Sequence, residues 1–327
     1  MDSILYKFKK NGHEEFIDFL KGVAILLVVF AHTIPLKQEL LFPIWGASKA
    51  VPIFLVIQMF HTFKRGEPKV PNFKKVFDRV LKPFLYIQII LLTFSLITSS
   101  ETTLETLCRF CKGGGMGPGS YYIWIYLQFS LILPNIYKLL SKYNQKRIFF
   151  ISLFTAILIE MACSVIDMPE RIYRILALRY LFLIYFGIEW CRKGIVFGKR
   201  EIFLGLIGLG AVVFFNYFYV PIEPFFFNTG WKSDRWITFI YVMYIFVPIL
   251  YKIYNKVGCK IKGVIYVLGK ASFEIFLIQM LVCCIIKPNV VGEFIDNNIL
   301  KWIVYLTITI SSSIGIGLLY YNRKHQN

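Results

Sequence analysis

The sequence has few charged residues. Only 17% of its 327 residues are Asp, Glu, Lys or Arg, whereas a soluble domain carries about 25%. Hydrophobic residues make up 57% of the chain, and the mean hydropathy is +0.61. A chain of this composition has too little polar surface to cover itself in water. We therefore expect a protein whose main solvent is the lipid bilayer.

Acidic residues are scarcer than basic ones, at 19 against 37, which gives a formal net charge of +18. In a soluble protein this excess would indicate a nucleic-acid partner or an acidic surface. In a membrane protein the cytoplasmic loops retain Lys and Arg, which accounts for the excess. We therefore expect no nucleic-acid partner.

Motifs for metals, disulfides and secretion are also scarce. Cys108 and Cys111 form a single C-x-x-C with no second pair and no nearby His cluster, so no metal site is expected. A disulfide between these two cysteines in an outer loop stays an alternative, but the sequence favours two free thiols. No cleavable signal peptide is evident, because the apolar run 16–36 is too long for one and lacks a small-residue cleavage site.

Long apolar runs are abundant. A membrane-spanning helix needs about 20 mostly apolar residues. Ten runs of that kind occur, at 16–36, 41–62, 80–99, 121–140, 148–166, 172–191, 202–221, 236–254, 264–286 and 299–321. We predict an all-α fold, a polytopic membrane bundle of about ten transmembrane helices. The prediction places residues 1–327 in a single domain with no separate soluble domain.

Charge alternates between successive loops. The N-terminus, every second loop and the C-terminal tail together hold 21 of the 37 basic residues. The other loops are poorer in Lys and Arg and contain acids such as Glu101, Glu105 and Asp167. Because cytoplasmic segments retain basic residues, both ends of the chain are predicted to be cytoplasmic.

One predicted outer loop contains a glycine-rich run at 113–119, Gly-Gly-Gly-Met-Gly-Pro-Gly. The run lacks the Lys-Ser/Thr ending of a phosphate-binding loop. We interpret it as a flexible lip over a cavity.

The first apolar run holds a cluster of ionisable residues, Asp18, Lys21 and His32. At about 100° per residue, the step from Lys21 to His32 turns a helix by about 1100°, about 20° more than three circles. All three side chains therefore share one face, with Lys21 and His32 about 16 Å apart along the axis. Ionisable groups are costly in the membrane, and an imidazole can take a proton from a hydroxyl. A snorkelling lysine and a histidine that hydrogen-bonds a neighbouring helix stay an alternative.

Residues 17–32 read Ile-Asp-Phe-Leu-Lys-Gly-Val-Ala-Ile-Leu-Leu-Val-Val-Phe-Ala-His. This segment closely resembles the first helix of the acyltransferase 3 family of membrane acyltransferases. That helix typically shows Asp-x-x-Arg-Gly-x-Ala followed by a His, with ten residues between the Arg and the His. Lys21 stands at the Arg position, where it keeps the charge but loses bidentate anion binding.

The resemblance extends along most of the chain. Residues 74–83 look like the family's basic stretch entering its third helix, and residues 117–124 look like the segment before its fourth. Residues 268–279 look like its late Gly-x-x-Ser segment, which commonly ends in His. Here Gln279 replaces that His, so a late-helix histidine cannot be part of this protein's mechanism.

The resemblance implies transfer of an acyl group, usually acetyl from acetyl-CoA, to a hydroxyl of a sugar or another cell-surface acceptor. Coenzyme A would stay cytoplasmic, with its phosphates at Lys75, Arg79 and Lys82. Ordinary cytoplasmic loop charge accounts for the same three cations and stays an alternative.

The catalytic roles that follow concern the first-helix cluster. His32 would deprotonate the acceptor hydroxyl, which attacks the thioester directly; an acyl-histidine intermediate is the alternative. Asp18 and Lys21 would organise the cofactor end, given their distance from His32.

Three polar residues deeper in the chain lie within or at apolar runs: Gln128, Glu160 and Arg179. We predict that they line the acceptor cavity. Glu160 is a candidate partner for Arg179, and a purely structural pair stays open.

A second class of function is a transporter or flippase of a lipid-linked sugar or acyl group. The dense first-helix motif favours the enzyme, and the absence of recognisable inverted repeats weighs against a common transporter plan. The expected location is the plasma membrane of a bacterium. The expected partners are the lipid bilayer, an acyl-CoA donor and a saccharide or other hydroxyl-bearing acceptor, while a homo-oligomer stays open.

Overall fold

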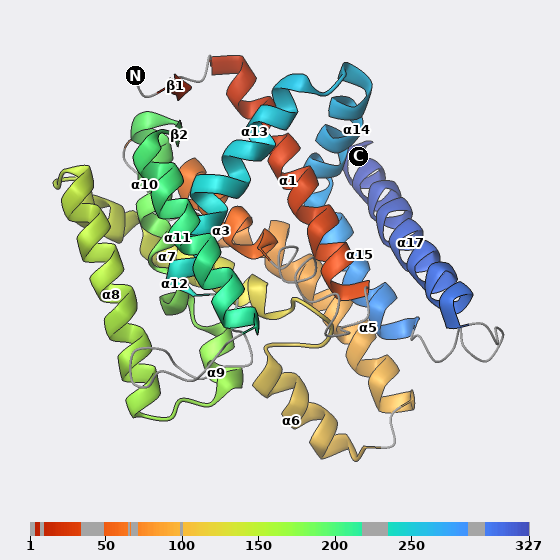
Figure 1. Ribbon diagram of the computed structural model, residues 1–327. Coiled ribbons are helices and arrows are strands. Elements are labelled where there is room, and N and C mark those ends of the chain that lie inside the picture. Colours follow the sequence, from red (N-terminus) through yellow and green to blue (C-terminus); the bar gives the residue numbers. More distant parts are fainter. Residues whose placement is uncertain are drawn as a thin grey trace.

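The computed structural model describes residues 4–6, 10–33, 49–64, 66, 71–98, 101–217, 235–286 and 298–326 (Figure 1). The first half contains β1 (Ile4–Tyr6), α1 (Lys10–Thr33), α3 (Ala50–Phe63), α4 (Phe73–Val76), the π-helical turn η2 (Phe77–Leu81), α5 (Lys82–Thr98), α6 (Thr103–Gly113), α7 (Tyr121–Leu140) and α8 (Gln145–Val165).

The second half contains α9 (Glu170–Ile175), the 3-10 turn η3 (Ala177–Tyr180), α10 (Leu183–Lys193), β2 (Ile195–Phe197), α11 (Lys199–Tyr217), α12 (Trp236–Tyr241), the π-helical turn η4 (Val242–Phe246), α13 (Val247–Lys256), α14 (Cys259–Lys270), α15 (Ser272–Ile285) and α17 (Asn298–Gln326). Strands β1 and β2 form one short antiparallel pair, with Ile4 opposite Phe197. The predicted helical fold is thus confirmed, with this small addition.

Six helical segments are long and apolar enough to cross a membrane. They are Glu15–Thr33, Phe73–Thr98, Tyr121–Leu140, Gln145–Val165, Trp236–Lys256 and Leu300–Gln326. The pair α14–α15 would make a seventh if it counts as one span bent by 71°. Every predicted apolar run overlaps at least one helix, but α3 has only 14 residues and the run at 172–191 is broken into three pieces. The count of ten spans therefore stays a prediction.

Parts of four predicted runs lie outside the described residues, at 34–36, 41–48, 99 and 218–221. Elsewhere the lipid-facing surface can be read from single helices. On α8, Phe150, Phe154 and Leu158 recur at intervals of four and are exposed. Large apolar side chains on one exposed helical stripe are expected where lipid, not water, surrounds the helix.

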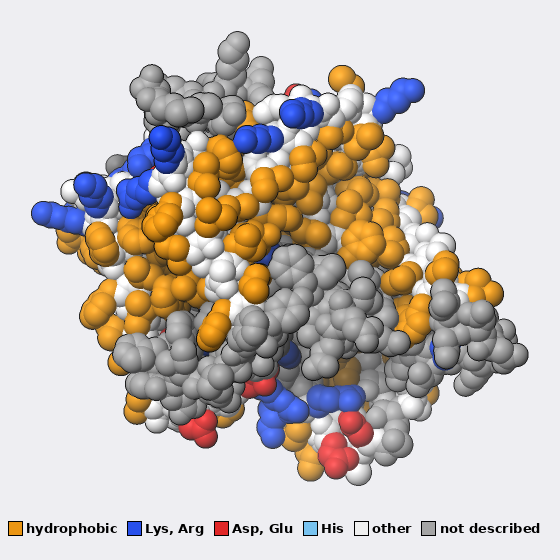
Figure 2. Space-filling model, in the orientation of Figure 1, with side chains coloured by type: hydrophobic (Ala, Val, Ile, Leu, Met, Phe, Trp, Pro, Cys, Tyr) orange, Lys and Arg blue, Asp and Glu red, His pale blue; other side chains and the backbone are white. Residues whose placement is uncertain are grey.

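The two ends of the bundle differ in charge. Strand β1 and the C-terminal end of α17 lie toward one end, and α6 and α9 lie at the other (Figure 1). On the face shown in Figure 2, Lys and Arg gather along the first end, and the acidic side chains visible there lie mostly near the second. Hydrophobic side chains occupy the zone between. This is the pattern of a membrane protein with a basic face and a mixed face.

Helix α1 lies in the interior and packs against α14, α3, α15 and α17. Two glycines allow its backbone to touch the α14–α15 bend. A Cβ on Gly22 would lie 2.0 Å from the carbonyl oxygen of Ile265, and one on Gly269 would lie 1.7 Å from that of Asp18. Both distances are far below contact range, so this helix crossing exists only with glycine at both positions.

Overpacking usually lowers the free energy of unfolding by about 1–3 kcal/mol. We predict that Gly269→Ala lowers the stability of the purified protein by more than this. A methyl group cannot fit against Asp18 without moving the α1 backbone. The measurement is the thermal midpoint and the monodisperse fraction in detergent. Gly263→Ala is the matched control, because a Cβ there meets nothing within 4 Å. Equal stability of the two variants would contradict the proposed crossing.

Candidate active site

His32 occupies the last turn of α1. Across from it on α15, Gln279 is fully buried and its amide nitrogen donates to Cys283 Sγ at 3.3 Å. The Gln279 side chain lies within interaction range of the imidazole. Yet His32 Nδ1 and Gln279 Oε1, both shielded from solvent, complete no hydrogen bond with the described residues. Buried polar atoms of this kind are rare, so this pair marks a candidate site.

The glycine-rich loop closes against the same histidine. Gly119 has a φ of +86°, and a Cβ there would lie 2.8 Å from the Phe276 ring and 3.6 Å from His32 Cε1. Phe276 in turn meets the ring of Tyr122 edge to face, with centroids 5.8 Å apart. The end of α1, the start of α7 and the middle of α15 thus meet at His32, together with this loop.

The loop is pinned by hydrogen bonds, which differs from the predicted flexible lip. Gln88 of α5 is only 1% exposed, and both polar atoms of its side-chain amide hydrogen-bond the backbone of Met116. Its Nε2 donates to the Met116 carbonyl at 3.0 Å, and its Oε1 accepts from the Met116 amide at 2.5 Å. The Trp124 indole donates to the Gly114 carbonyl at 2.5 Å. Gln88 was not predicted from the sequence, although a glutamine inside an apolar run was a signal for it.

Asp18 and Lys21 form an ion pair nearer the other end of α1. Lys21 Nζ lies 2.8 Å from Asp18 Oδ1, and the two side chains are 26% and 20% exposed. Lys270, at the end of α14, is close enough to Asp18 to be attracted by it. Because α1 is one uninterrupted helix, the predicted separation of about 16 Å between Lys21 and His32 holds. Lys270 belongs to this cluster but was not predicted.

Lys75, Arg79 and Lys82 follow one another on α4, η2 and the start of α5, and all three are exposed. They therefore form a basic stretch but not a closed site. Arg79 is close enough to act electrostatically on Tyr126, which lies on α7.

A row of aromatic rings leads from Arg79 toward His32. The rings of Tyr126 and Tyr122, one helical turn apart on α7, have centroids 6.4 Å apart. Tyr122 then contacts Phe276, which borders Gly119 beside the histidine. Gln58 of α3 donates to the Tyr126 carbonyl and to Ser130, which ties α3 to this face of α7. Tyr122 and Tyr126 are only partly buried although they lie in the helical bundle.

Gln128 lies where it bridges two helix ends. Its Nε2 donates to the Ile175 carbonyl at 2.7 Å, and its Oε1 accepts from the Ala177 amide at 3.1 Å. These bonds satisfy the backbone where α9 ends and η3 begins. The geometry gives Gln128 a structural task, and its predicted contact with the acceptor stays a prediction.

Glu160 and Arg179 lie in one buried group, and their predicted place in the acceptor cavity stays a prediction. Glu160 accepts a short hydrogen bond from the Tyr173 hydroxyl and lies 3.9 Å from Arg235 Nη1. The Arg179 guanidinium lies 4.9 Å from the ring centroids of both Tyr173 and Tyr180. Arg235, the residue before α12, is a member of this group that was not predicted, because its partner Glu160 is distant in the sequence.

Two sulfur residues considered for a metal or a disulfide lie in α6. Cys108 and Cys111 are exposed and free. Among the described residues, no group of three His, Cys, Asp or Glu side chains is arranged to hold a metal ion.

The geometry defines a class of protein: a helical integral membrane protein with an imidazole at a buried meeting point of helices. The chain matches the model of the acyltransferase 3 family, described as an acyltransferase domain, over residues 14–320. It therefore belongs to that family, and the resemblance seen in the sequence is confirmed. Comparison with curated proteins and with solved structures gave no match.

We predict that Gln88→Leu releases the glycine-rich loop without unfolding the bundle. Two hydrogen bonds to Met116 disappear, at about 1 kcal/mol each, so amide exchange at Met116 should become roughly 30-fold faster. Hydrogen–deuterium exchange on a peptide covering 113–119 measures this. Gln58→Leu removes an amide that binds α7 instead, so it should leave the loop's exchange unchanged. Unchanged exchange in Gln88→Leu would contradict the pinning.

Proposed function

We propose that this membrane acyltransferase moves acetyl from cytoplasmic acetyl-CoA to a hydroxyl of a cell-surface or lipid-linked saccharide. Family membership gives the acyltransferase class. The observation that carries the rest is the position of His32, whose shielded Nδ1 makes no hydrogen bond with the described residues. Membership also favours the enzyme over the transporter or flippase considered from the sequence.

In the proposed reaction, His32 acts as general base. The imidazole takes the proton of the acceptor hydroxyl while its oxygen attacks the thioester carbonyl. A carbon–oxygen bond forms, the carbon–sulfur bond breaks, and the proton passes from the imidazolium to the departing coenzyme A thiolate. Gln279 can orient the ring through its amide. Direct transfer needs both substrates at His32 together, which a site built from four converging segments favours.

The donor is proposed to enter from the end that carries Asp18, Lys21 and the basic stretch. Lys75, Arg79 and Lys82 would meet the phosphates of coenzyme A, since exposed cations attract phosphate. The row Tyr126, Tyr122 and Phe276 supports a route for the pantetheine arm toward His32.

The proposed orientation has both termini in the cytoplasm of a bacterial cell, with ten crossings of the plasma membrane. The gathering of Lys and Arg at the end that carries β1 supports it (Figure 2). The acceptor would then approach from the end of α6 and α9. There, the half-buried Gln128 and the buried Glu160 and Arg179 are proposed to border its saccharide.

We expect His32→Ala to lower acetyl transfer by about 10²–10⁴-fold, the usual contribution of a general base. The assay gives membranes radiolabelled acetyl-CoA and counts label in the lipid-linked and polysaccharide fractions. His61→Ala is the control, since it removes an imidazole from α3 instead. Undiminished transfer by His32→Ala would exclude His32 as the base. Wild type that neither transfers label nor binds acetyl-CoA would return the transporter to consideration.

Lys21 should act through charge and not through its particular shape. We expect Lys21→Arg to keep kcat and the KM for acetyl-CoA within about threefold, because Arg preserves the charge beside Asp18. Lys21→Gln should raise that KM by about tenfold or more, since Asp18 loses its 2.8 Å partner. Steady-state kinetics in nanodiscs measures both values. Equal kinetics for the Arg and Gln variants would show that the charge has no role.

A further inference from the structure

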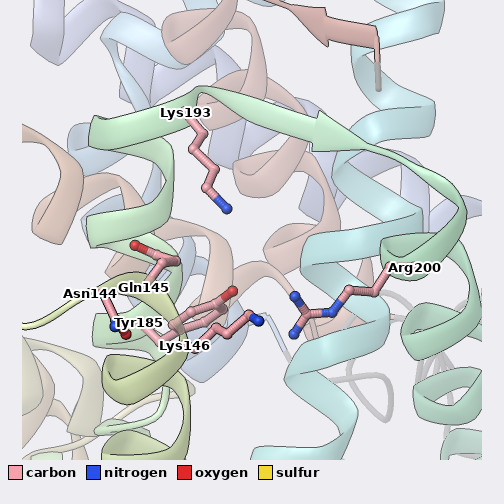
Figure 3. A pocket seen from close by; sticks show the side chains of 6 residues that line it. All are labelled: Asn144, Gln145, Lys146, Tyr185, Lys193 and Arg200. Carbon is pink, nitrogen blue, oxygen red and sulfur yellow. The ribbon is translucent and has the colours of Figure 1, made fainter. Parts of the chain in front are cut away.

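A polar cavity lies away from His32, at the end of the bundle that carries β1 and β2. Its volume is about 440 Å³, and its walls are Asn144, Gln145, Lys146, Tyr185, Lys193 and Arg200 (Figure 3). These residues come from the start of α8, from α10 and from the start of α11. None belongs to the predicted donor or acceptor sites.

Three cations converge on this cavity. In Figure 3 the Lys146 amine and the Arg200 guanidinium point toward one another, and the Lys193 amine points at them from the other side. None of the three forms an ion pair within the part of the chain that the structure describes. Like charges held together cost energy unless an anion lies between them. All three side chains are exposed, as is the nearby Lys142; what sets the three apart is that they line one cavity.

Arg192, next to Lys193 in the chain, has a structural role that the three cavity cations lack within the described part of the chain. Arg192 donates to the carbonyls of Tyr143 and Ser141, both at 3.0 Å. It thereby fixes the turn that leads into α8, and with it one wall of the cavity. Lys193, the next residue, makes no such bond with the described residues and faces the cavity.

The acids nearest the cavity do not close it. Glu189 attracts Lys193, but it is only 2% exposed and is not a lining residue. Its two oxygens accept from the hydroxyls of Tyr185, at 2.7 Å, and Tyr244, at 3.0 Å. Glu201, in the first turn of α11, interacts with Glu189 and is not a lining residue.

The start of α8 adds further donors. Asn144 caps this 21-residue helix by accepting from the Arg147 amide at 2.9 Å, so the positive end of the helix dipole faces the cavity region. Gln145 lies beside Tyr185, and both atoms of its shielded amide lack a hydrogen bond to any described residue. An amide donor, a helix N-terminus and three cations are together the chemistry that binds phosphate.

We propose that this cavity binds a phosphate-bearing anion, either the head group of an anionic phospholipid or a soluble phosphate compound. Its volume suits a head group or a phosphate ester, and its place at the basic end suits an anionic leaflet. Arg200 and Lys193 hold the phosphate oxygens, and Lys146 adds charge from α8. The proposal does not rest on acetyl-CoA as donor or on His32 as base.

The experiment measures thermal midpoints of the purified full chain in nanodiscs of phosphatidylcholine alone or with phosphatidylglycerol. A second arm adds inorganic phosphate to the phosphatidylcholine discs. The variant K146Q/K193Q/R200Q empties the cavity of cations. K138Q/K142Q/K256Q is its control, because it removes the same charge from exposed positions. Arg200→Gln alone provides a milder variant should the triple variant fold poorly.

We expect phosphatidylglycerol or phosphate to raise the midpoint of wild type and of the control. Half-maximal stabilisation should need at least tenfold more ligand in K146Q/K193Q/R200Q and in Arg200→Gln. A response to phosphatidylglycerol alone identifies a lipid head group, and a response to phosphate identifies a soluble source. A wild type that responds to neither, or cavity variants that respond like the control, would overturn the proposal.

Discussion

The contact between the backbone of α1 and the bend of α14–α15 is the constraint on which the site depends. Lipid tails are as apolar as side chains, so membrane helices associate through close packing and polar contacts. Gly22 and Gly269 remove the two Cβ atoms that would keep these backbones apart. The same approach brings Lys270 near Asp18, so an electrostatic cluster forms where the helices touch.

The direction of α15 follows from that contact. The chain bends by 71° between α14 and α15, at Ala271, two residues after Gly269. Helix α15 then runs along α1, so Phe276 and Gln279 reach the last turn of α1, where His32 lies. The glycine-rich loop completes the site from the other side because Gln88 and Trp124 hold it. A change at the bend would therefore move one wall of the histidine site.

Local patterns in the sequence predicted much of this arrangement. Apolar runs marked most helical regions, with α4 and α6 as exceptions, and helical spacing related Lys21 to His32. Both inferences depend only on nearby residues. The breaks in the run at 172–191 escaped prediction, since hydropathy averages over them. Gln88, Lys270 and Arg235 also escaped, because their roles come from contacts between distant segments. For example, Gln88 holds Met116 across 28 positions of sequence.

Gln279 narrows what chemistry this site can perform. The resembling segment of the family commonly has His at this position, and an amide cannot take up a proton near neutral pH. The side chains identified around His32 are Gln279, Phe276 and Tyr122. Among these four, the imidazole is the group suited to general acid–base chemistry. In the proposed reaction, the proton removed from the acceptor would therefore return through the same ring. A single base that serves both steps is consistent with direct transfer, in which attack and departure occur at one carbonyl carbon beside one imidazole.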